Sequence, residues 1–471
     1  MKTDPILVFD AGSSSLKATL FSANGEILDR DEVAYRPGSQ PHRLDPEAWW
    51  EAAVEAVSHL PPLQLSAIAL SGTMENLVAV AKDGSGLGEA LLYSDPSGAP
   101  FCESLGASID AGTTGNAAEP LMTAFKLAYL RDSEPARFAE AACFLPGSKD
   151  FLALKLTGHC ITDPTCAATT GLMDIAARDW SDPLLKHFGI TRNRLPEVLA
   201  ADTIVGDLTE AAADVLGVEA GIPVVNGCGD GGATTIGSGA DHEADISLYL
   251  GTTGWVARIA AFVPGAPPRS FYRLPHPLTH DIVEIAPILS AGAAAHWART
   301  SLGLTIAEGD DLALAADAEP GEALFLPYLN GERSPFLDLD LRAGFLGVSA
   351  SDGPGQLYRA VLEGVAFAIA ANIEAMGGLG GGTVSLVGGG GLSRIWPQLI
   401  ADVLQVSITA PADPVSVTAF GAFRIARRAL GNGEVDSGFS VVAEPRPERI
   451  ERIERQRRRF AAGTQFARTL R

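Results

Sequence analysis

Long apolar runs are absent from this 471-residue sequence. None reaches the roughly 18–20 residues that a helix needs to span a bilayer, so we expect no membrane-spanning segment. The apolar stretch that begins at Ile6 is typical of a strand, which leaves no room before it for a signal peptide. Together these absences predict a cytoplasmic protein that does not associate with membranes.

Positive charge and cysteine are also scarce. The formal net charge is −22, and so acidic a surface disfavours non-specific binding to nucleic acid or anionic membranes. The five cysteines are odd in number and include no C-x-x-C pair, which predicts free thiols in a reducing cytosol. The last stretch differs, since residues 444–471 are basic, with nine Arg and four Glu. Ile450, Ile453 and Phe460 share one helical face there, which favours a terminal helix docked on an acidic body over a nucleic-acid tail.

What the sequence does have is length, glycine and alternating strand and helix patterns. The chain exceeds what one compact core usually holds, so two domains are expected. Glycine is abundant, at 51 residues, which indicates many tight turns. VFDAGSSSLKATLF (8–21) and LYLGTTGWVARIA (248–260) share one plan of strand, small polar turn and strand, which predicts two related halves. We expect the domains to be residues 1–242 and 243–471.

Local patterns place the main elements of both halves. Asp45 followed by Pro46 is typical of a helix start, with a capping carboxylate before a proline at the first helical position. Residues 120–160 are expected to be mainly helical. Strands are expected at residues 6–10, 15–21, 26–35 and 65–72, and helices at residues 290–303 and 355–376.

The stretch ILVFDAGSSSLKATLF (6–21) joins two predicted strands through a polar bend. Backbone N–H groups in such a bend, with the hydroxyls of Ser13 and Ser14, are suited to hold phosphate oxygens, and Lys17 adds a positive charge. A carboxylate at Asp10 would repel phosphate unless it holds Mg²⁺ between them. The alternative is an ordinary hairpin in which the serines cap the turn.

Two further glycine-rich turns follow apolar strands, at GTTG (251–254) and GGGGLS (388–393). One such turn is a weak signal on its own. Three of them in one long α/β chain indicate a nucleotide bound in a cleft between two halves.

Four segments resemble the FGGY carbohydrate kinases, whose ATPase fold is the two-domain, ribonuclease H-like fold of actin and Hsp70. They are FDAGSSSLK, FLPYLNGERSP, AGFLGVSASDGPGQLYRAVLE and GGGGLSRIWPQLIADVL, and they occur in the family's order along nearly the whole chain. The resemblance implies ATP and Mg²⁺ as cofactors and Asp10 as the metal-binding residue. The nucleotide-binding residues that it implies are Gly12, Ser13, Ser14, Lys17, Gly251, Thr252, Thr253, Gly292, Gly389, Gly390 and Ser393.

The catalytic residue that the resemblance implies is Asp230, in NGCGDGG after a predicted strand. A carboxylate at that position is suited to accept the proton of an attacking hydroxyl during phosphoryl transfer. The alternative is that Asp230 only caps the helix that begins beside it.

The match is weaker on the side of the sugar. By resemblance the substrate residues are Met74, Glu75, Asn76, Asp95 and Asp230. Glu75 and Asn76 replace the His-Gly that usually follows the methionine, Pro96-Ser97 replaces a common Thr-Arg, and Gly231 replaces an Asn or Gln. Such changes in a site that binds hydroxyl groups alter specificity strongly.

The sequence thus predicts an ATP-dependent sugar kinase of the pentulose kinase branch, which phosphorylates a small ketopentose, with D-xylulose as the leading substrate. Ribulose, gluconate, glycerol and other polyols or sugar acids are alternatives. A non-catalytic ATP-binding switch on the same fold is another, and a homodimer is left open. Domain closure is expected, because phosphoryl transfer competes with water in an open cleft. Only the resemblance makes residues 355–376 a hinge candidate.

Overall fold

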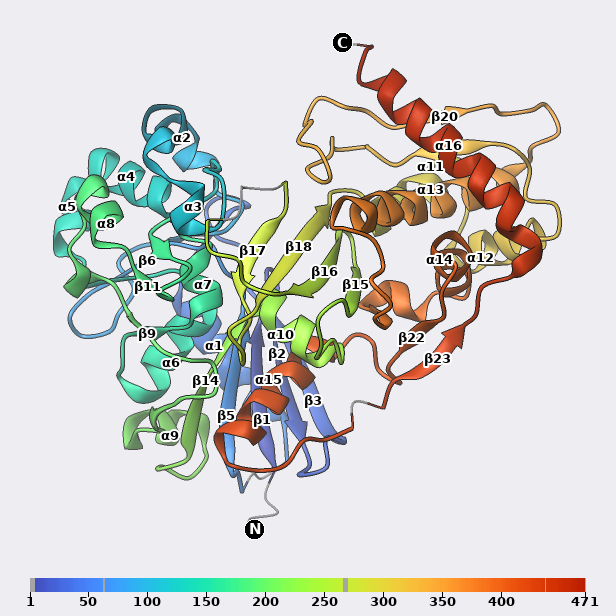
Figure 1. Cartoon of the computed structure of the whole chain (residues 1–471). Coiled ribbons are helices and arrows are strands. Elements are labelled where there is room, and N and C mark those ends of the chain that lie inside the picture. Colours follow the sequence, from blue (N-terminus) through green and yellow to red (C-terminus); the bar gives the residue numbers. More distant parts are fainter. Residues whose placement is uncertain (1–4, 62–63, 266–269, 437, 471) are drawn as a thin grey trace.

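The computed structural model describes residues 5–61, 64–265, 270–436 and 438–470. Each half of the chain is built on one large sheet, and the two sheets lie side by side with helices around them (Figure 1). The six strands of the first sheet are, in spatial order, β13 (Ile204–Asp207), β14 (Pro223–Gly229), β5 (Ala67–Gly72), β1 (Ile6–Ala11), β2 (Ser15–Phe21) and β3 (Ile27–Ala34). The seven strands of the second are β17 (Tyr272–Pro275), β18 (Ile282–Ile288), β16 (Gly254–Ala260), β15 (Ile246–Leu250), β21 (Val384–Val387), β22 (Ile408–Ala410) and β23 (Ser440–Ala443).

The two sheets share one topology. In the first, β1, β2 and β3 form an antiparallel meander, and β5 and β14 continue from β1 as parallel strands. In the second, β15, β16 and β18 are the corresponding antiparallel neighbours, with β17 added at the edge beyond β18, and β21 and β22 continue from β15 in parallel. The two related halves predicted from the internal similarity are therefore confirmed. The apolar run from Ile6 to Phe9 is buried on both faces, as expected of a central strand.

Sixteen α-helices are described around these sheets. In the first half they are α1 (Glu47–His59), α2 (Ala99–Leu105), α3 (Ala111–Thr114), α4 (Thr123–Ser133), α5 (Pro135–Glu140), α6 (Ser148–Thr157), α7 (Pro164–Ala168), α8 (Asp182–Phe188), α9 (Glu210–Leu216) and α10 (Asp230–Gly237). In the second they are α11 (Gly292–Leu302), α12 (Ile306–Ala315), α13 (Pro354–Ala375), α14 (Trp396–Leu404), α15 (Val417–Ala429) and α16 (Ile450–Ala467).

Short strands make up the remaining pairs. They are β4 (Arg43–Leu44), β6 (Val78–Val80), β7 (Ala90–Leu91), β8 (Cys143–Leu145), β9 (Ile161–Thr162), β10 (Met173–Asp174), β11 (Asp179–Trp180), β12 (Glu197–Val198), β19 (Leu324–Leu326) and β20 (Gly344–Leu346). Helix α1 begins at Glu47, one residue later than predicted, with Asp45 Oδ1 accepting a hydrogen bond from the Glu47 N–H at 3.0 Å.

Helix α15 returns from the second half of the sequence to the first sheet, as Figure 1 shows. Its buried face, including Phe423 and Ile425, shares one core with Ile6 and Val8 of β1. It crosses α10 so closely that a Cβ atom at Gly421 would lie 1.9 Å from the Ala233 carbonyl oxygen. The division of the chain at 242/243 stays a prediction, but packing joins α15 to the first sheet.

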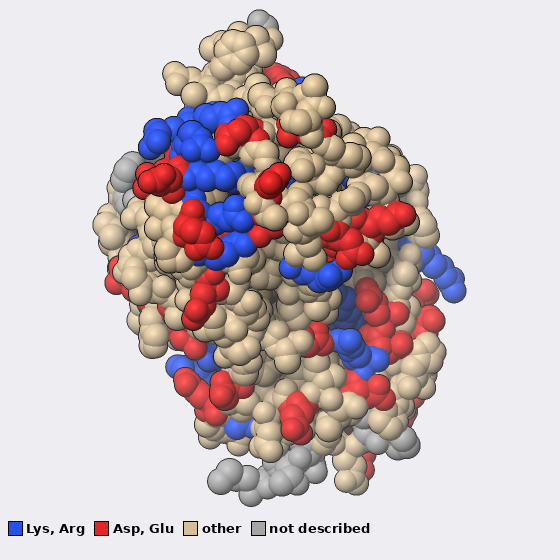
Figure 2. Space-filling model, turned by 90° about the vertical axis from the view of Figure 1, so that its right-hand side faces the viewer, with Lys and Arg blue, Asp and Glu red and all other residues tan. Residues whose placement is uncertain are grey.

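The terminal helix α16 docks on the second half, as predicted. Ile453 and Phe460 are buried, whereas Ile450 is 37% exposed. Its arginines contact acidic residues of the body: Arg452 pairs with Glu363 at 2.6 Å, and Arg455 pairs with Glu322 at 2.7 Å. Basic side chains lie among acidic ones on the face where this helix lies (Figure 2).

Two cysteines depart from the expectation of free thiols. Cys143 and Cys160 form a disulfide, whereas Cys102, Cys166 and Cys228 are free. Helix α6 lies between the two bonded cysteines, and the spacing of these cysteines in the sequence does not reveal that they meet. The expectation of free thiols was therefore wrong for this pair, and the cysteines no longer support a reducing compartment. Among the described residues, no helix combines the length and apolarity that crossing a membrane requires.

Candidate functional site

A cavity of about 720 Å³ lies between the two halves. Its first wall comes from the β1–β2 turn, the end of β5 and the start of α10, and its second wall comes from β15 to β18. The predicted site residues that line it are Asp10, Gly12, Ser13, Ser14, Lys17, Met74, Glu75, Asp230, Thr252 and Thr253. Residues that lie far apart in the sequence thus meet in one space.

The segment predicted to bind phosphate lies in the β1–β2 hairpin. Asp10 lies opposite Lys17 in the strand register, and Ser13 and Ser14 are exposed at the tip. The Gly12 N–H donates to the Ser15 carbonyl oxygen at 3.0 Å, so that donor serves the turn itself. The Ser15 hydroxyl donates to Glu32 Oε1 at 2.6 Å, which leaves Ser13 and Ser14 as the hydroxyls at the tip.

Asp230 is the first residue of α10 and directly follows β14. Its Oδ1 accepts a hydrogen bond from the Gly231 N–H at 2.8 Å, and the residue at the N-cap position is Gly229. The side chain therefore does not make the capping contact, to a donor two or three residues on, that the alternative interpretation requires.

The two aspartates of the cavity hold protons more tightly than usual. Burial raises the pKa of Asp230 to about 7, and the charge of Asp10 adds to that rise. Burial also raises the pKa of Asp10 to about 6, against the opposing effect of Lys17. A carboxyl group with a pKa near neutrality is suited to act as a general base. A cation placed beside Asp10 would relieve the repulsion between the two acids, so these residues fit a divalent metal.

Glu75 lies in the wall of the same cavity in an unusual conformation. Its φ is +61°, in the left-handed region that side chains other than glycine rarely adopt. Its side chain is buried, and among the described residues its Oε1 has no hydrogen-bond partner. Burial raises the pKa of Glu75, whereas Lys126 and Arg333 oppose that shift. Strain and an unsatisfied acceptor at one residue are typical of a ligand site.

Asn76 and Asp95, two predicted substrate residues, are not among the residues that line the cavity. Both are fully buried. The Asn76 side chain donates to the Thr73 carbonyl oxygen at 3.0 Å, and Asp95 Oδ2 accepts from Arg43 Nε at 3.2 Å. These two side chains therefore lie behind the cavity wall and form hydrogen bonds within the protein.

Of the predicted nucleotide-binding residues in the second half, some line the cavity and others do not. Thr252 and Thr253 line the cavity, and Gly251 lies beside them and accepts a hydrogen bond from the Gly292 N–H at 2.9 Å. The Ser393 hydroxyl accepts from the Trp396 N–H at 3.2 Å, at the start of α14. Gly251, Gly292, Gly389, Gly390 and Ser393 are not among the lining residues.

Aromatic residues of the second sheet were missed in the sequence. Tyr249 and Trp255 stack with their ring centroids 3.9 Å apart, and both line the cavity together with Tyr272. The Trp255 indole N–H is buried and, among the described residues, has no acceptor. The sequence shows that Trp255 follows the GTTG turn, but it does not show which face of the sheet the side chain of Trp255 lies on.

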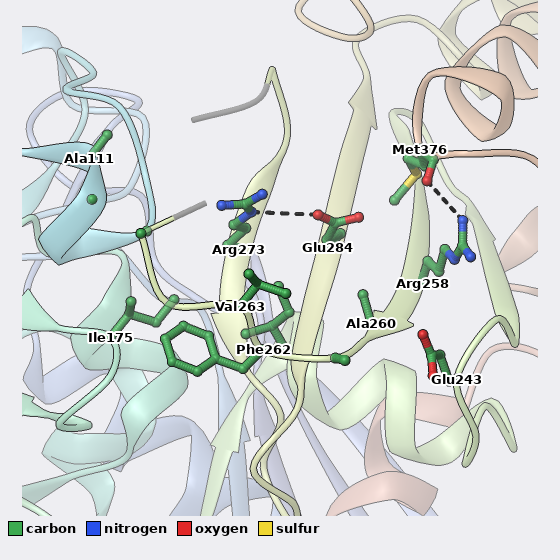
Figure 3. Close-up of a pocket in the computed structure, with 15 residues that line it drawn as sticks. Ala111, Ile175, Glu243, Arg258, Ala260, Phe262, Val263, Arg273, Glu284 and Met376 are labelled. Carbon is green, nitrogen blue, oxygen red and sulfur yellow. Dashed lines mark hydrogen bonds and ion pairs between the residues drawn. The ribbon is translucent and has the colours of Figure 1, made fainter. Parts of the chain in front are cut away.

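A smaller cavity of about 380 Å³ contains none of the predicted site residues. Figure 3 shows it beside β16, β17 and β18, with Arg273 directed toward Glu284 and Arg258 toward Met376. Arg273 Nε lies 3.5 Å from Glu284 Oε1, and Arg258 donates to the Met376 carbonyl oxygen at 2.8 Å. Because these cations are engaged with the protein itself, we assign the site to the larger cavity.

Comparisons with known proteins agree on one family. The sequence model of the N-terminal domain of the FGGY family of carbohydrate kinases matches residues 5–237, and that of the C-terminal domain matches residues 280–430. A xylulose kinase of Escherichia coli (strain K12) is 32% identical, over 89% of this chain and 88% of the relative. A gluconokinase of Bacillus subtilis (strain 168) is 24% identical, over 94% of this chain and 90% of the relative.

The fold agrees with the same family. A crystal structure described as a xyloylose kinase from Brucella ovis superimposes with a TM-score of 0.89 at 28% identity, over 99% of both chains. The predicted two-domain α/β fold of the actin and Hsp70 type is therefore confirmed.

Proposed function

Because this chain belongs to the FGGY family of carbohydrate kinases, we propose that it transfers the γ-phosphate of ATP to a hydroxyl group of D-xylulose. Family membership makes the protein a phosphotransferase with an alcohol group as acceptor, which excludes the non-catalytic switch. The observation that carries the assignment of the site is Asp230, with a pKa of about 7, in one cavity with the Asp10 hairpin.

Asp230 acts as the general base of the transfer. Its carboxylate accepts the proton of the sugar hydroxyl while that oxygen forms a bond to the γ-phosphorus and the bond to the β-phosphate oxygen breaks, which releases ADP. Ser13, Ser14 and Lys17 hold the phosphates from the first half, and Thr252 and Thr253 hold them from the second. Both halves then contribute to placing the phosphate in line with the hydroxyl.

Asp10 would hold the Mg²⁺ that accompanies ATP. Such an ion neutralises charge on the phosphate groups. The raised pKa values support this assignment, because burial raises both and the charge of Asp10 adds to the rise at Asp230, so a cation between them would be favourable. We also propose that the reaction takes place in the cytoplasm, where ATP is available. That the protein forms a homodimer stays a prediction.

The sugar end of the cavity supports a neutral polyol over a sugar acid. Glu75 Oε1 and the Trp255 indole N–H offer an acceptor and a donor for hydroxyl groups. The cations nearby are engaged, since Lys126 donates to the Glu75 carbonyl oxygen at 2.6 Å and Arg333 pairs with Glu119. A carboxylate on the substrate would therefore meet the negative charges of Glu75 and Asp230, while both of these cations are already engaged.

The test is ADP release measured with a panel of acceptors in the presence of ATP and Mg²⁺. We expect D-xylulose to give the highest kcat/KM, with gluconate at least about tenfold lower, because an uncompensated charge near another costs on the order of 1.4 kcal/mol or more. A higher kcat/KM with gluconate, or with glycerol, would overturn the choice of substrate and leave the kinase assignment intact.

A further inference from the structure

The turn that carries Asp230 forms a hydrogen bond to a side chain that has no part in the proposed mechanism. Strand β14 ends at Gly229, whose N–H donates to Thr165 Oγ1 at 2.9 Å. A Cβ atom at Gly229 would lie 2.2 Å from Met74 Sδ and 3.1 Å from Thr165 Oγ1, so this backbone is packed closely against both side chains. The Thr165 hydroxyl therefore contacts the residue directly before the proposed base.

The Thr165 hydroxyl has its orientation fixed. Thr165 is fully buried in α7, and its Oγ1 donates to Asp163 Oδ2 at 2.5 Å while it accepts from Gly229. The Thr165 N–H donates to the same Asp163 oxygen at 2.7 Å. One hydroxyl thus makes one donated and one accepted bond, which leaves it little freedom to rotate.

A buried cation holds Asp163 in turn. Lys149 Nζ lies 3.3 Å from Asp163 Oδ1, 2.9 Å from Asp150 Oδ1 and 3.0 Å from Asn226 Oδ1. Burial lowers the pKa of Lys149, but the carboxylates of Asp150 and Asp163 outweigh that effect and raise it. Asp150, Asp163 and Cys166 lie close enough together to ligate a metal, but the ammonium group of Lys149 contacts both carboxylates.

Lys149 lies in the first turn of α6, and this turn also contacts the ends of β1 and β5 at the site. Ser148, the residue before Lys149, donates through Oγ to the Ala11 carbonyl oxygen at 2.8 Å, next to Asp10. It also accepts from Thr73 Oγ1 at 3.1 Å, one residue before Met74. The first turn of α6 thus connects the ends of β1, β5 and β14, from which the phosphate loop, the substrate wall and the base extend.

We propose that Thr165 is a positioning residue for phosphoryl transfer, with its hydroxyl, oriented by Asp163 and Lys149, fixing the Gly229–Asp230 turn. This inference rests on the proposed role of Asp230 as the base. A shift of about 1 Å in a reacting group can cost on the order of a hundredfold in rate. Loss of one hydrogen bond to the turn is expected to produce a part of that effect without removing any group that contacts ATP.

The test compares Thr165→Val, which removes the hydroxyl at constant shape, with Thr165→Ser, which keeps it. We expect Thr165→Val to lower kcat by about 10–100-fold, with KM for ATP within about twofold of wild type. Thr165→Ser should retain kcat within about threefold. Thermal unfolding shows whether each variant is folded, and Thr165→Ala replaces the valine variant if that one fails to fold.

A purely structural role predicts a different pattern. A folded Thr165→Val enzyme with wild-type kcat, or a serine variant as impaired as the valine variant, would overturn the proposal. Asp230→Asn is measured beside them, because full activity in that variant would refute the base itself. The two failures are thereby distinguishable.

Discussion

At the scale of single residues, the protonation of Asp230 should control the rate. Burial, and then the charge of Asp10, raises its pKa to about 7. A general base must be unprotonated, so kcat/KM for the sugar should rise with pH below about pH 7 and level off above it, by up to about tenfold per pH unit. A pH profile of kcat/KM tests this, and a flat profile down to about pH 5.5 would contradict the role of Asp230.

The same raised pKa makes a prediction about stability. An aspartate whose pKa is higher in the folded than in the unfolded state destabilises the fold once the unfolded form is ionised. This penalty grows as pH rises from the ordinary aspartate pKa of 3.8 to about 7 and is constant above. Asp230→Asn should therefore melt at a higher temperature than wild type at about pH 8, and the gain should vanish near pH 4. Asp214→Asn, at an exposed position of α9, is the matched control and should show no such gain.

At the scale of elements, the crossing of α10 and α15 should tolerate no side chain at its centre. In Gly421→Ala the new methyl group would lie 1.9 Å from the Ala233 carbonyl oxygen, so the helices must separate. We expect a loss of about 1–3 kcal/mol in the free energy of unfolding, as in other overpacked cores. Gly433→Ala, with no atom within 4 Å of the added Cβ, is the control for denaturant unfolding. Equal stability of the two variants would refute the role given to this contact.

The elements also show what the sequence allows one to predict. Strands β1 and β2 and helix α13 were expected from runs of apolar residues, which reflect burial directly. The return of α15 to the first sheet was not, because a buried helical face does not identify the element that covers it. The Cys143–Cys160 disulfide was missed for the same reason, since it depends on how α6 folds back.

The site itself was predictable in type but not in detail. A glycine- and serine-rich turn after a strand indicated Asp10 and Lys17, the family resemblance implied Asp230, and the structure brings these residues into one cavity. The directions of side chains were beyond the sequence. Asn76 was predicted to contact the substrate, but its side chain donates to the backbone of Thr73. Trp255, which was not predicted, lines the cavity.

At the scale of the whole molecule, the position of the cavity between two halves predicts closure around the substrates. Water must be kept from the transferred phosphate, so the halves should approach when both ligands are present. Small-angle X-ray scattering of Asp230→Asn with ATP, Mg²⁺ and D-xylulose should give a smaller radius of gyration than the free protein. Each ligand alone is the control, and an unchanged radius with both would argue against closure.

Transfer of radiolabelled γ-phosphate from ATP to D-xylulose, compared between wild type and Asp230→Asn under identical conditions, tests the central claim most directly. We predict labelled sugar phosphate with the wild type and a loss of at least about a hundredfold in the variant, whose affinity for ATP stays unchanged, because a general base supplies about that factor. Labelling by the variant at the wild-type rate would contradict the account.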